Sequence, residues 1–131
     1  MNMGVGVMAG DESLHGYRVL VVEDEFVVAL LVEDVLHSLG CAMIGPASHI
    51  AAAMTLAQKE ALDFALLDVN VAGERIFPVA EILCERGIPF AFVTGYGRQG
   101  LDDRFSEVPV LQKPFLDSDL VSLLKGQGRA R

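Results

Sequence analysis

The sequence predicts an α/β fold in which helices cover both faces of a parallel sheet. Short apolar runs alternate with longer segments of helical periodicity from residue 18 onward. These runs are apolar at successive positions, which is typical of parallel strands buried on both faces. The chain has 131 residues, 52% of them hydrophobic, and this suits one domain with a largely aliphatic core.

Five strands are predicted, each an apolar run of strand length. They cover residues 18–22, 41–47, 63–68, 88–94 and 108–112. β-Branched residues favour the first strand, "RVLVV", and Pro46 is expected to stop the second. A helical segment follows each strand, so the chain divides into five strand-and-helix units.

The predicted helices follow from apolar spacing and from residues that begin or end a helix. They cover residues 26–39, 49–61, 78–86 and 118–125, with a shorter helix, weakened by glycines, over 98–105. Ser48 and Asp117 are expected to cap the second and the last helix. Pro78 suits a first turn, and Gly87 and Gly126 are expected to end their helices.

One domain is expected over residues 17–126. Residues 1–16 are rich in glycine and lack the basic start of a signal peptide, so they are interpreted as a flexible extension. Residues 127–131 form a short tail, too short for an output domain.

Composition excludes several classes of partner. The formal net charge of −8 disfavours direct binding to nucleic acid. No apolar run approaches the roughly 18 residues that span a bilayer, so no membrane partner is expected. Cys41 and Cys84 lack metal-ligand spacing and are interpreted as reduced thiols of a cytoplasmic protein, with a disulfide as the less favoured alternative.

Polar side chains follow four of the predicted strands. Glu23 and Asp24 follow the first strand, Asp68 ends the third, Thr94 ends the fourth and Lys113 follows the fifth. Ligands of doubly wound sheets bind outside the carboxyl ends of the strands, so these side chains are expected to meet there. A simpler interpretation, in which Asp24 or Glu25 only caps the first helix, stays open.

These residue types favour metal-assisted phosphoryl chemistry. Neighbouring carboxylates repel one another unless a cation intervenes, and hard oxygen ligands suit Mg²⁺. An ionised Asp68 is then a candidate nucleophile towards phosphorus, with Thr94 and Lys113 placed to neutralise the other phosphoryl oxygens.

The order of these residues resembles that of receiver domains of two-component response regulators, over residues 18–125. The resemblance implies a flavodoxin-like, doubly wound sheet with strand order 2-1-3-4-5. It implies that Asp68 accepts a phosphoryl group from a phosphohistidine on a sensor histidine kinase or a histidine phosphotransfer protein. It also implies a Mg²⁺ (or Mn²⁺) site with Asp24 as a direct ligand, Glu23 acting through water, and Asp68 and the backbone carbonyl of Asn70 as further ligands.

By the same resemblance, Thr94 and Lys113 would bind the phosphoryl group, and the peptide bond before Pro114 would be cis. The stretch "FVTGYG" is similar to a subgroup of receivers, often stand-alone and common in alphaproteobacteria, whose fourth strand ends in Phe-Ala-Thr-Gly. Typical receivers have a rotating aromatic residue where this chain has Val110. The loop 95–104, with Tyr96, is therefore predicted to switch instead; the alternative is that Tyr96 only lines the rim.

The glycines of "GYGRQG" match the G-x-G-x-x-G spacing of dinucleotide sites. That motif belongs on the first strand–helix turn, which here carries "EDE" and would repel a pyrophosphate. The glycines are therefore interpreted as a tight turn beside the phosphorylation site.

The function predicted from these residues is a single-domain receiver that signals by phosphorylation-dependent protein binding or by shuttling phosphate. It would not be an enzyme beyond slow loss of its own phosphate. Two alternatives are a scaffold that works without phosphorylation and an aspartyl-phosphate hydrolase, which Asn70 disfavours because it replaces the second acid. The partners expected are the phosphate donor and a downstream protein, and the chain is expected to be a monomer or a weak dimer, with Phe26 or Leu30 on the dimer face.

Overall fold

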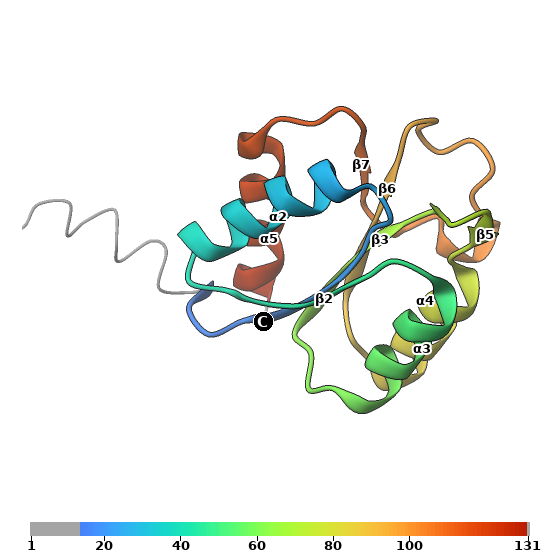
Figure 1. Cartoon of the computed structure of the whole chain (residues 1–131), viewed down its shortest axis with the longest axis horizontal. Coiled ribbons are helices and arrows are strands. Elements are labelled where there is room, and N and C mark those ends of the chain that lie inside the picture. Colours follow the sequence, from blue (N-terminus) through green and yellow to red (C-terminus); the bar gives the residue numbers. More distant parts are fainter. Residues whose placement is uncertain (1–13, 131) are drawn as a thin grey trace, which may run out of the picture.

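A computed structural model describes residues 14–130, with the side chains from 127 onward excepted. Its strands are β1 (Arg18–Val22), β2 (Ala42–Ala47), β3 (Phe64–Asp68), β6 (Phe90–Thr94) and β7 (Val110–Gln112). They form one sheet in the order β2-β1-β3-β6-β7, and every neighbouring pair is parallel (Figure 1). This is the predicted doubly wound order.

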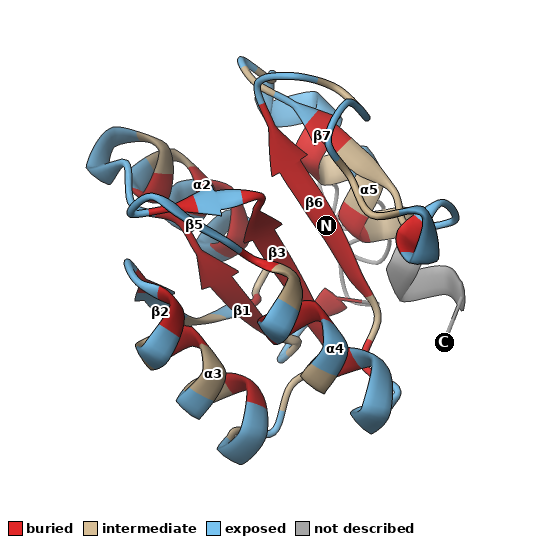
Figure 2. Ribbon diagram, turned by 90° about the vertical axis from the view of Figure 1, so that its right-hand side faces the viewer, coloured by how far each residue is buried: buried red, intermediate tan, exposed pale blue. Residues whose placement is uncertain are grey.

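Helices cover both faces of the sheet. Helices α2 (Phe26–Ser38) and α5 (Asp117–Ala130) pack together on one face, and α3 (Ile50–Lys59) and α4 (Phe77–Arg86) on the other (Figure 1). The central strands β1, β3 and β6 are buried, the edge strands β2 and β7 are partly exposed, and the helices bury only their inner sides (Figure 2). None of the described helices is long and apolar enough to cross a bilayer.

Two hydrophobic clusters, one on each face of the sheet, form the core. The cluster beneath α3 and α4 contains an aromatic group in which neighbouring ring centroids lie 5.6 to 6.0 Å apart. Its members are Phe77, Phe90, Phe92 and Phe105. Such ring contacts stabilise a core beyond the area they bury, and here they anchor the segment that follows β6.

Several predicted helix boundaries are wrong. The cap of α3 is His49, not Ser48, because the His49 ring accepts the Ala52 N–H at 3.3 Å. Asp117 is the first residue of α5 rather than its cap, and α5 continues past Gly126. Gly87, in contrast, ends α4 in the left-handed conformation with φ 71°, as predicted.

The predicted helix over 98–105 is reduced to a single 3-10 turn, η2 (Asp103–Phe105). The fourth strand-and-helix unit is thus incomplete in the described chain, and irregular backbone joins β6 to β7. A two-stranded antiparallel pair, β4 (Asn70–Val71) and β5 (Glu74–Arg75), was not predicted.

The packed fold begins ahead of the predicted boundary at residue 17. Leu14 is fully buried and belongs to the core cluster beneath α2 and α5. The Gly16 N–H donates to the Gly40 carbonyl at 2.8 Å, which ties this turn to the end of α2. The rest of the predicted extension, residues 1–13, lies outside the described residues.

Candidate functional site

The structure brings the predicted polar residues together at the carboxyl edge of the sheet. Asp68 is the last residue of β3 and Thr94 the last of β6, while Glu23 follows β1 directly. Asp68 is paired in register with Val93, so the ends of β3 and β6 lie side by side. Glu23, Asp68 and Thr94 are the buried polar residues of the described chain.

The Lys113 ammonium lies among three carboxylates. Its Nζ donates to Glu25 Oε1 at 2.6 Å, to Glu23 Oε2 at 3.2 Å and to Asp68 Oδ2 at 3.2 Å. The Lys113 side chain is 18% exposed and that of Glu25 62% exposed. Sequence reasoning placed Lys113 here but missed the role of Glu25, which it considered only as a helix cap.

The carboxyl of Asp68 is hard to ionise in this setting. Burial raises its pKa to about 7, and the charge of Glu23 and a hydrogen bond with Glu23 raise it too. Lys113 acts in the opposite direction but does not cancel these effects. A further cation beside Asp68 would favour its ionised form.

Lys113 is firmly charged. Burial works to lower its pKa, but the hydrogen bond to Glu25 and the charges of Asp68 and Glu23 outweigh burial. The pKa of Lys113 is therefore held above its ordinary value. The site contains a permanent cation beside its most buried acids.

Asp24 lies in the same cleft but is oriented by a different segment. Its Oδ2 accepts the backbone N–H of Ala72 at 2.9 Å, and Ala72 has the positive φ of 51°. Asp24 lines a cleft of about 440 Å³ together with Glu25, Asp68 and Asn70. Neither Asp24 nor Glu25 caps α2 through its side chain, so the helix-cap interpretation is wrong.

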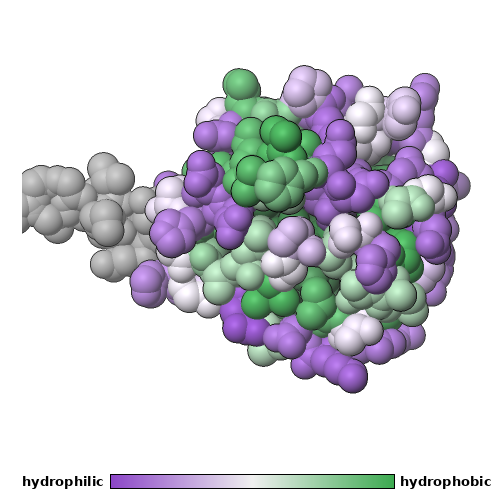
Figure 3. All heavy atoms as spheres, viewed as in Figure 1, coloured by the Kyte–Doolittle hydropathy of each residue, from purple (hydrophilic) through white to green (hydrophobic). Residues whose placement is uncertain are grey.

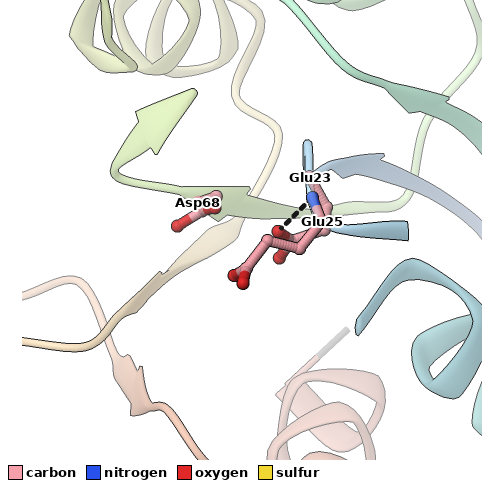
Figure 4. A group of neighbouring side chains, drawn as sticks. All are labelled: Glu23, Glu25 and Asp68. Atoms are coloured by element: carbon pink, nitrogen blue, oxygen red, sulfur yellow. Dashed lines mark hydrogen bonds between the residues drawn. The ribbon is translucent and has the colours of Figure 1, made fainter. Parts of the chain in front are cut away.

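The acids provide a plain set of oxygen ligands for a metal ion. Oxygens of Glu23, Glu25 and Asp68 all lie within 4.8 Å of one another (Figure 4). In Figure 4 the two glutamates come from the segment after β1 and Asp68 from the end of β3. Hard oxygen ligands suit Mg²⁺, and a single ammonium cannot neutralise all these acids. The donor set thus fits a divalent cation.

Thr94 and the loop after it form the other wall of the cleft. Thr94 Oγ1 accepts the Tyr96 backbone N–H at 3.1 Å, which leaves the hydroxyl hydrogen available to another acceptor. The Tyr96 side chain is largely exposed. The Lys113–Pro114 peptide bond is cis, and so is that between Gly45 and Pro46.

Sequence reasoning also missed Arg98, which fastens the loop between β6 and β7. Its guanidinium donates to the carbonyls of Ser106 at 2.6 Å and of Val108 at 2.9 Å. These are backbone acceptors in an irregular segment, so no sequence spacing pointed to them.

Known structures place this geometry in a family. No protein-family model matches the chain. The solution structure of SdrG from Sphingomonas melonis Fr1 is 39% identical and has a TM-score of 0.76, covering 86% of this chain and 96% of that one. The PhyR response regulator REC domain from Erythrobacter litoralis is 26% identical with a TM-score of 0.78, covering 88% and 92%. The chain belongs to the receiver domains of response regulators.

The resemblance to receivers, including alphaproteobacterial ones, is thereby confirmed. The receiver domain of the sensor histidine kinase PA1611 from Pseudomonas aeruginosa PAO1 has a magnesium ion in its active-site cleft. That structure is 22% identical to this chain, with a TM-score of 0.74 over 87% of this chain and 98% of that one, so the likeness shows the fold alone. The transcriptional regulatory protein PdtaR of Mycobacterium tuberculosis is 28% identical over 112 residues, or 82% of this chain. This receiver spans 55% of the length of PdtaR, about half of that curated relative.

Proposed function

We propose that this receiver accepts a phosphoryl group on Asp68 from a phosphohistidine of a sensor histidine kinase or a histidine phosphotransfer protein. The observation that carries the proposal is the position of Asp68: it ends a central strand, faces an open cleft and lies 3.2 Å from the Lys113 ammonium. A carboxylate in this position is an oxygen nucleophile with a cation beside the incoming charge.

The residues that would hold Mg²⁺ (or Mn²⁺) are Asp24, Asp68 and the backbone carbonyl of Asn70, with Glu23 acting through water. The structure supports this assignment in part, because Asp24, Asp68 and Asn70 line one cleft. Glu25 also has an oxygen within 4.8 Å of those of Glu23 and Asp68, but its carboxylate is paired with Lys113 and is not among the ligands proposed here. A bound divalent cation would supply the positive charge that favours ionised Asp68 and would neutralise phosphoryl oxygens.

The chain's own residues do the rest. An Asp68 oxygen forms the new bond to phosphorus, while the bond to the donor nitrogen breaks and its electron pair stays on the imidazole. Lys113, fixed beside Asp68, pairs with one phosphoryl oxygen, and the free hydroxyl hydrogen of Thr94 is available for another. Positioning and charge, rather than acid–base catalysis, account for the reaction.

Signalling would proceed through a second protein. Phe26, Val27 and Leu30 on α2 are exposed apolar residues. Figure 3 shows hydrophobic side chains gathered on the face that carries α2. Leu116, just before α5, is exposed as well. An apolar patch beside acidic side chains suits a protein partner with a basic rim. The weak dimer predicted from the sequence would use the same patch. In this proposal the downstream partner is a cytoplasmic protein.

The loop 95–104 remains our candidate for the element that moves. Val110 is only partly buried on β7 and has no ring to rotate, while Tyr96 is bonded through its N–H to Thr94. A Thr94 that turns towards a phosphoryl group would alter that bond. Hydrogen exchange of residues 95–104 with and without beryllofluoride tests this, and equal protection in both states would remove the loop from the mechanism.

The phosphoacceptor role is tested by intact mass after incubation with acetyl phosphate. We expect a gain of one phosphoryl group that requires Mg²⁺ and is absent from Asp68→Asn. If acetyl phosphate fails, a panel of phosphorylated histidine kinases and phosphotransfer proteins is the next donor. A chain that accepts phosphate from none of them is a scaffold that works without phosphorylation.

A further inference from the structure

Glu25 makes the shortest contact that Lys113 has in the site. The separation of Nζ from Glu25 Oε1 is 2.6 Å, against 3.2 Å to each of Glu23 and Asp68. Short charged contacts are the strong ones, so the ammonium is drawn towards the outer acid. Glu25 directly precedes α2, and its side chain makes no capping hydrogen bond to the helix, so the carboxylate is free to bind Lys113.

Three acids share the Lys113 ammonium. Its Nζ lies 3.2 Å from Asp68 Oδ2, and a cation at that distance stabilises a charged carboxylate. Two other acids divide the charge of the same ammonium with it. Of these, the Glu23 side chain is buried, whereas the Glu25 side chain is 62% exposed and has room to turn into solvent.

We propose that Glu25 competes with the incoming phosphoryl group for Lys113. In the unphosphorylated protein Glu25 holds the ammonium towards the rim of the cleft, and the contact has to break before Lys113 can pair with a phosphoryl oxygen. Glu25 is thus a positioning residue that slows phosphorylation of Asp68 by small phosphate donors such as acetyl phosphate. The inference rests on the proposed function, because it concerns the same reaction at Asp68.

The reaction with acetyl phosphate shows where Glu25 acts. An ionised Asp68 oxygen bonds to phosphorus, the bond from phosphorus to the acetyl oxygen breaks, and acetate leaves with the electron pair. No proton is transferred, so the developing charge must be met by cations. Lys113 meets it only when it has left Glu25.

The test compares the rate of phosphorylation of wild type and Glu25→Gln by intact mass, at saturating Mg²⁺ and limiting acetyl phosphate. An ion pair with one exposed partner is worth little, so we expect a rate about two- to fivefold higher in the variant. The affinity for beryllofluoride, measured by ¹⁹F NMR, is expected to rise by a similar factor. A purely structural role for Glu25 would not raise that affinity.

Two variants separate the contact from simple charge. Glu33→Gln removes one exposed acid from the same helix and has the same net charge as Glu25→Gln, so it reports general repulsion of the anionic donor. We expect it to react at nearly the wild-type rate. Glu25→Asp keeps the charge but shortens the reach, and it should resemble Glu25→Gln more than wild type.

Specific results would overturn the inference. A Glu25→Gln rate equal to or below that of wild type would show that Glu25 is neutral or holds Lys113 productively. Weaker Mg²⁺ binding by Glu25→Gln, measured by titration, would make Glu25 a metal ligand instead. A wild-type protein that takes neither phosphate nor beryllofluoride would contradict the proposed function and this inference together. If wild type and Glu25→Gln are both phosphorylated at equal rates, only this inference is contradicted.

Discussion

Arg75 donates a hydrogen bond from its guanidinium to the backbone carbonyl of Gly100. This joins the strand pair that follows Asp68 to the loop that follows Thr94. The same guanidinium lies 5.2 Å from the centre of the Phe77 ring, so it is held in place from below. Two segments that border the cleft of Asp68 and Thr94 are therefore connected to one another outside it, by the side chain of Arg75.

Replacing Arg98 should destabilise the loop between β6 and β7. Arg98→Lys keeps the charge but loses the planar fork that bonds the Ser106 and Val108 carbonyls. We expect a loss of about 1–2 kcal/mol in the stability of this segment, seen as faster hydrogen exchange over residues 95–109. Arg104→Lys is the matched control, since the Arg104 guanidinium donates to the Asp102 and Glu81 carboxylates rather than to loop carbonyls, and it should exchange nearly like wild type.

Asp68→Asn should stabilise the metal-free protein at high pH. The folded-state pKa of Asp68, about 7, lies above its ordinary value of 3.8, so the protonated form favours the fold. That contribution is fully present below about pH 4 and is lost as the pH rises through 7. The amide of Asp68→Asn cannot ionise and avoids this loss. Thermal unfolding should therefore show a free energy of unfolding higher than that of wild type by about 1–3 kcal/mol at pH 8, with a smaller difference towards pH 4. A gain that is the same at both pH values would contradict this account.

The two thiols should differ sharply in reactivity. Cys84 is exposed, whereas Cys41 is buried, and burial together with the charge of Asp63 raises the Cys41 pKa to about 11. In the folded protein we expect a thiol reagent to modify one cysteine quickly at pH 8, and Cys84→Ala to abolish that phase. The Cys41 contribution to stability is present below pH 9 and lost as the pH rises through 11. Rapid modification of two thiols in native protein would show that Cys41 is accessible.

Gly45→Ala should be one of the more damaging single changes on the edge strand β2. Gly45 has φ 104°, and a Cβ there would lie 2.8 Å from the Ala47 nitrogen and 2.9 Å from the Val21 carbonyl oxygen. Because both neighbours are backbone atoms, we expect a loss of at least about 2 kcal/mol in urea unfolding. Gly126→Ala, inside α5 with open space around it, should instead gain up to about 1 kcal/mol.

The sheet and most of the site could be predicted because their signals are local. An apolar run followed by an acid, as at Asp68, marks both a buried strand and the edge at which it ends. Parallel pairing then places the ends of separate strands together without any further information. Lys113 and Thr94 were placed correctly for this reason.

The contacts that were missed depend on distances that no pattern in the chain encodes. Glu25 pairs with Lys113 across 88 positions, and Arg98 bonds backbone carbonyls whose location depends on how an irregular loop turns. His49, not Ser48, caps α3 because its ring nitrogen accepts the Ala52 N–H of the first turn. The sequence places both residues side by side before the helix, so it could not distinguish them. Loop geometry and choices between adjacent caps are settled by tertiary packing.

The burial of Leu14 bears on where this receiver can be cut. A recombinant fragment that starts at Tyr17, the predicted domain boundary, would lose the Leu14 side chain, which fills the layer beneath α2 and α5. Losing a buried leucine lowers the free energy of unfolding by about 2–5 kcal/mol, which is a large fraction of the total stability of a small domain. Fusion partners and affinity tags therefore belong before Leu14, and a fragment trimmed to the recognisable motifs would be expected to express as a weaker protein than the one described.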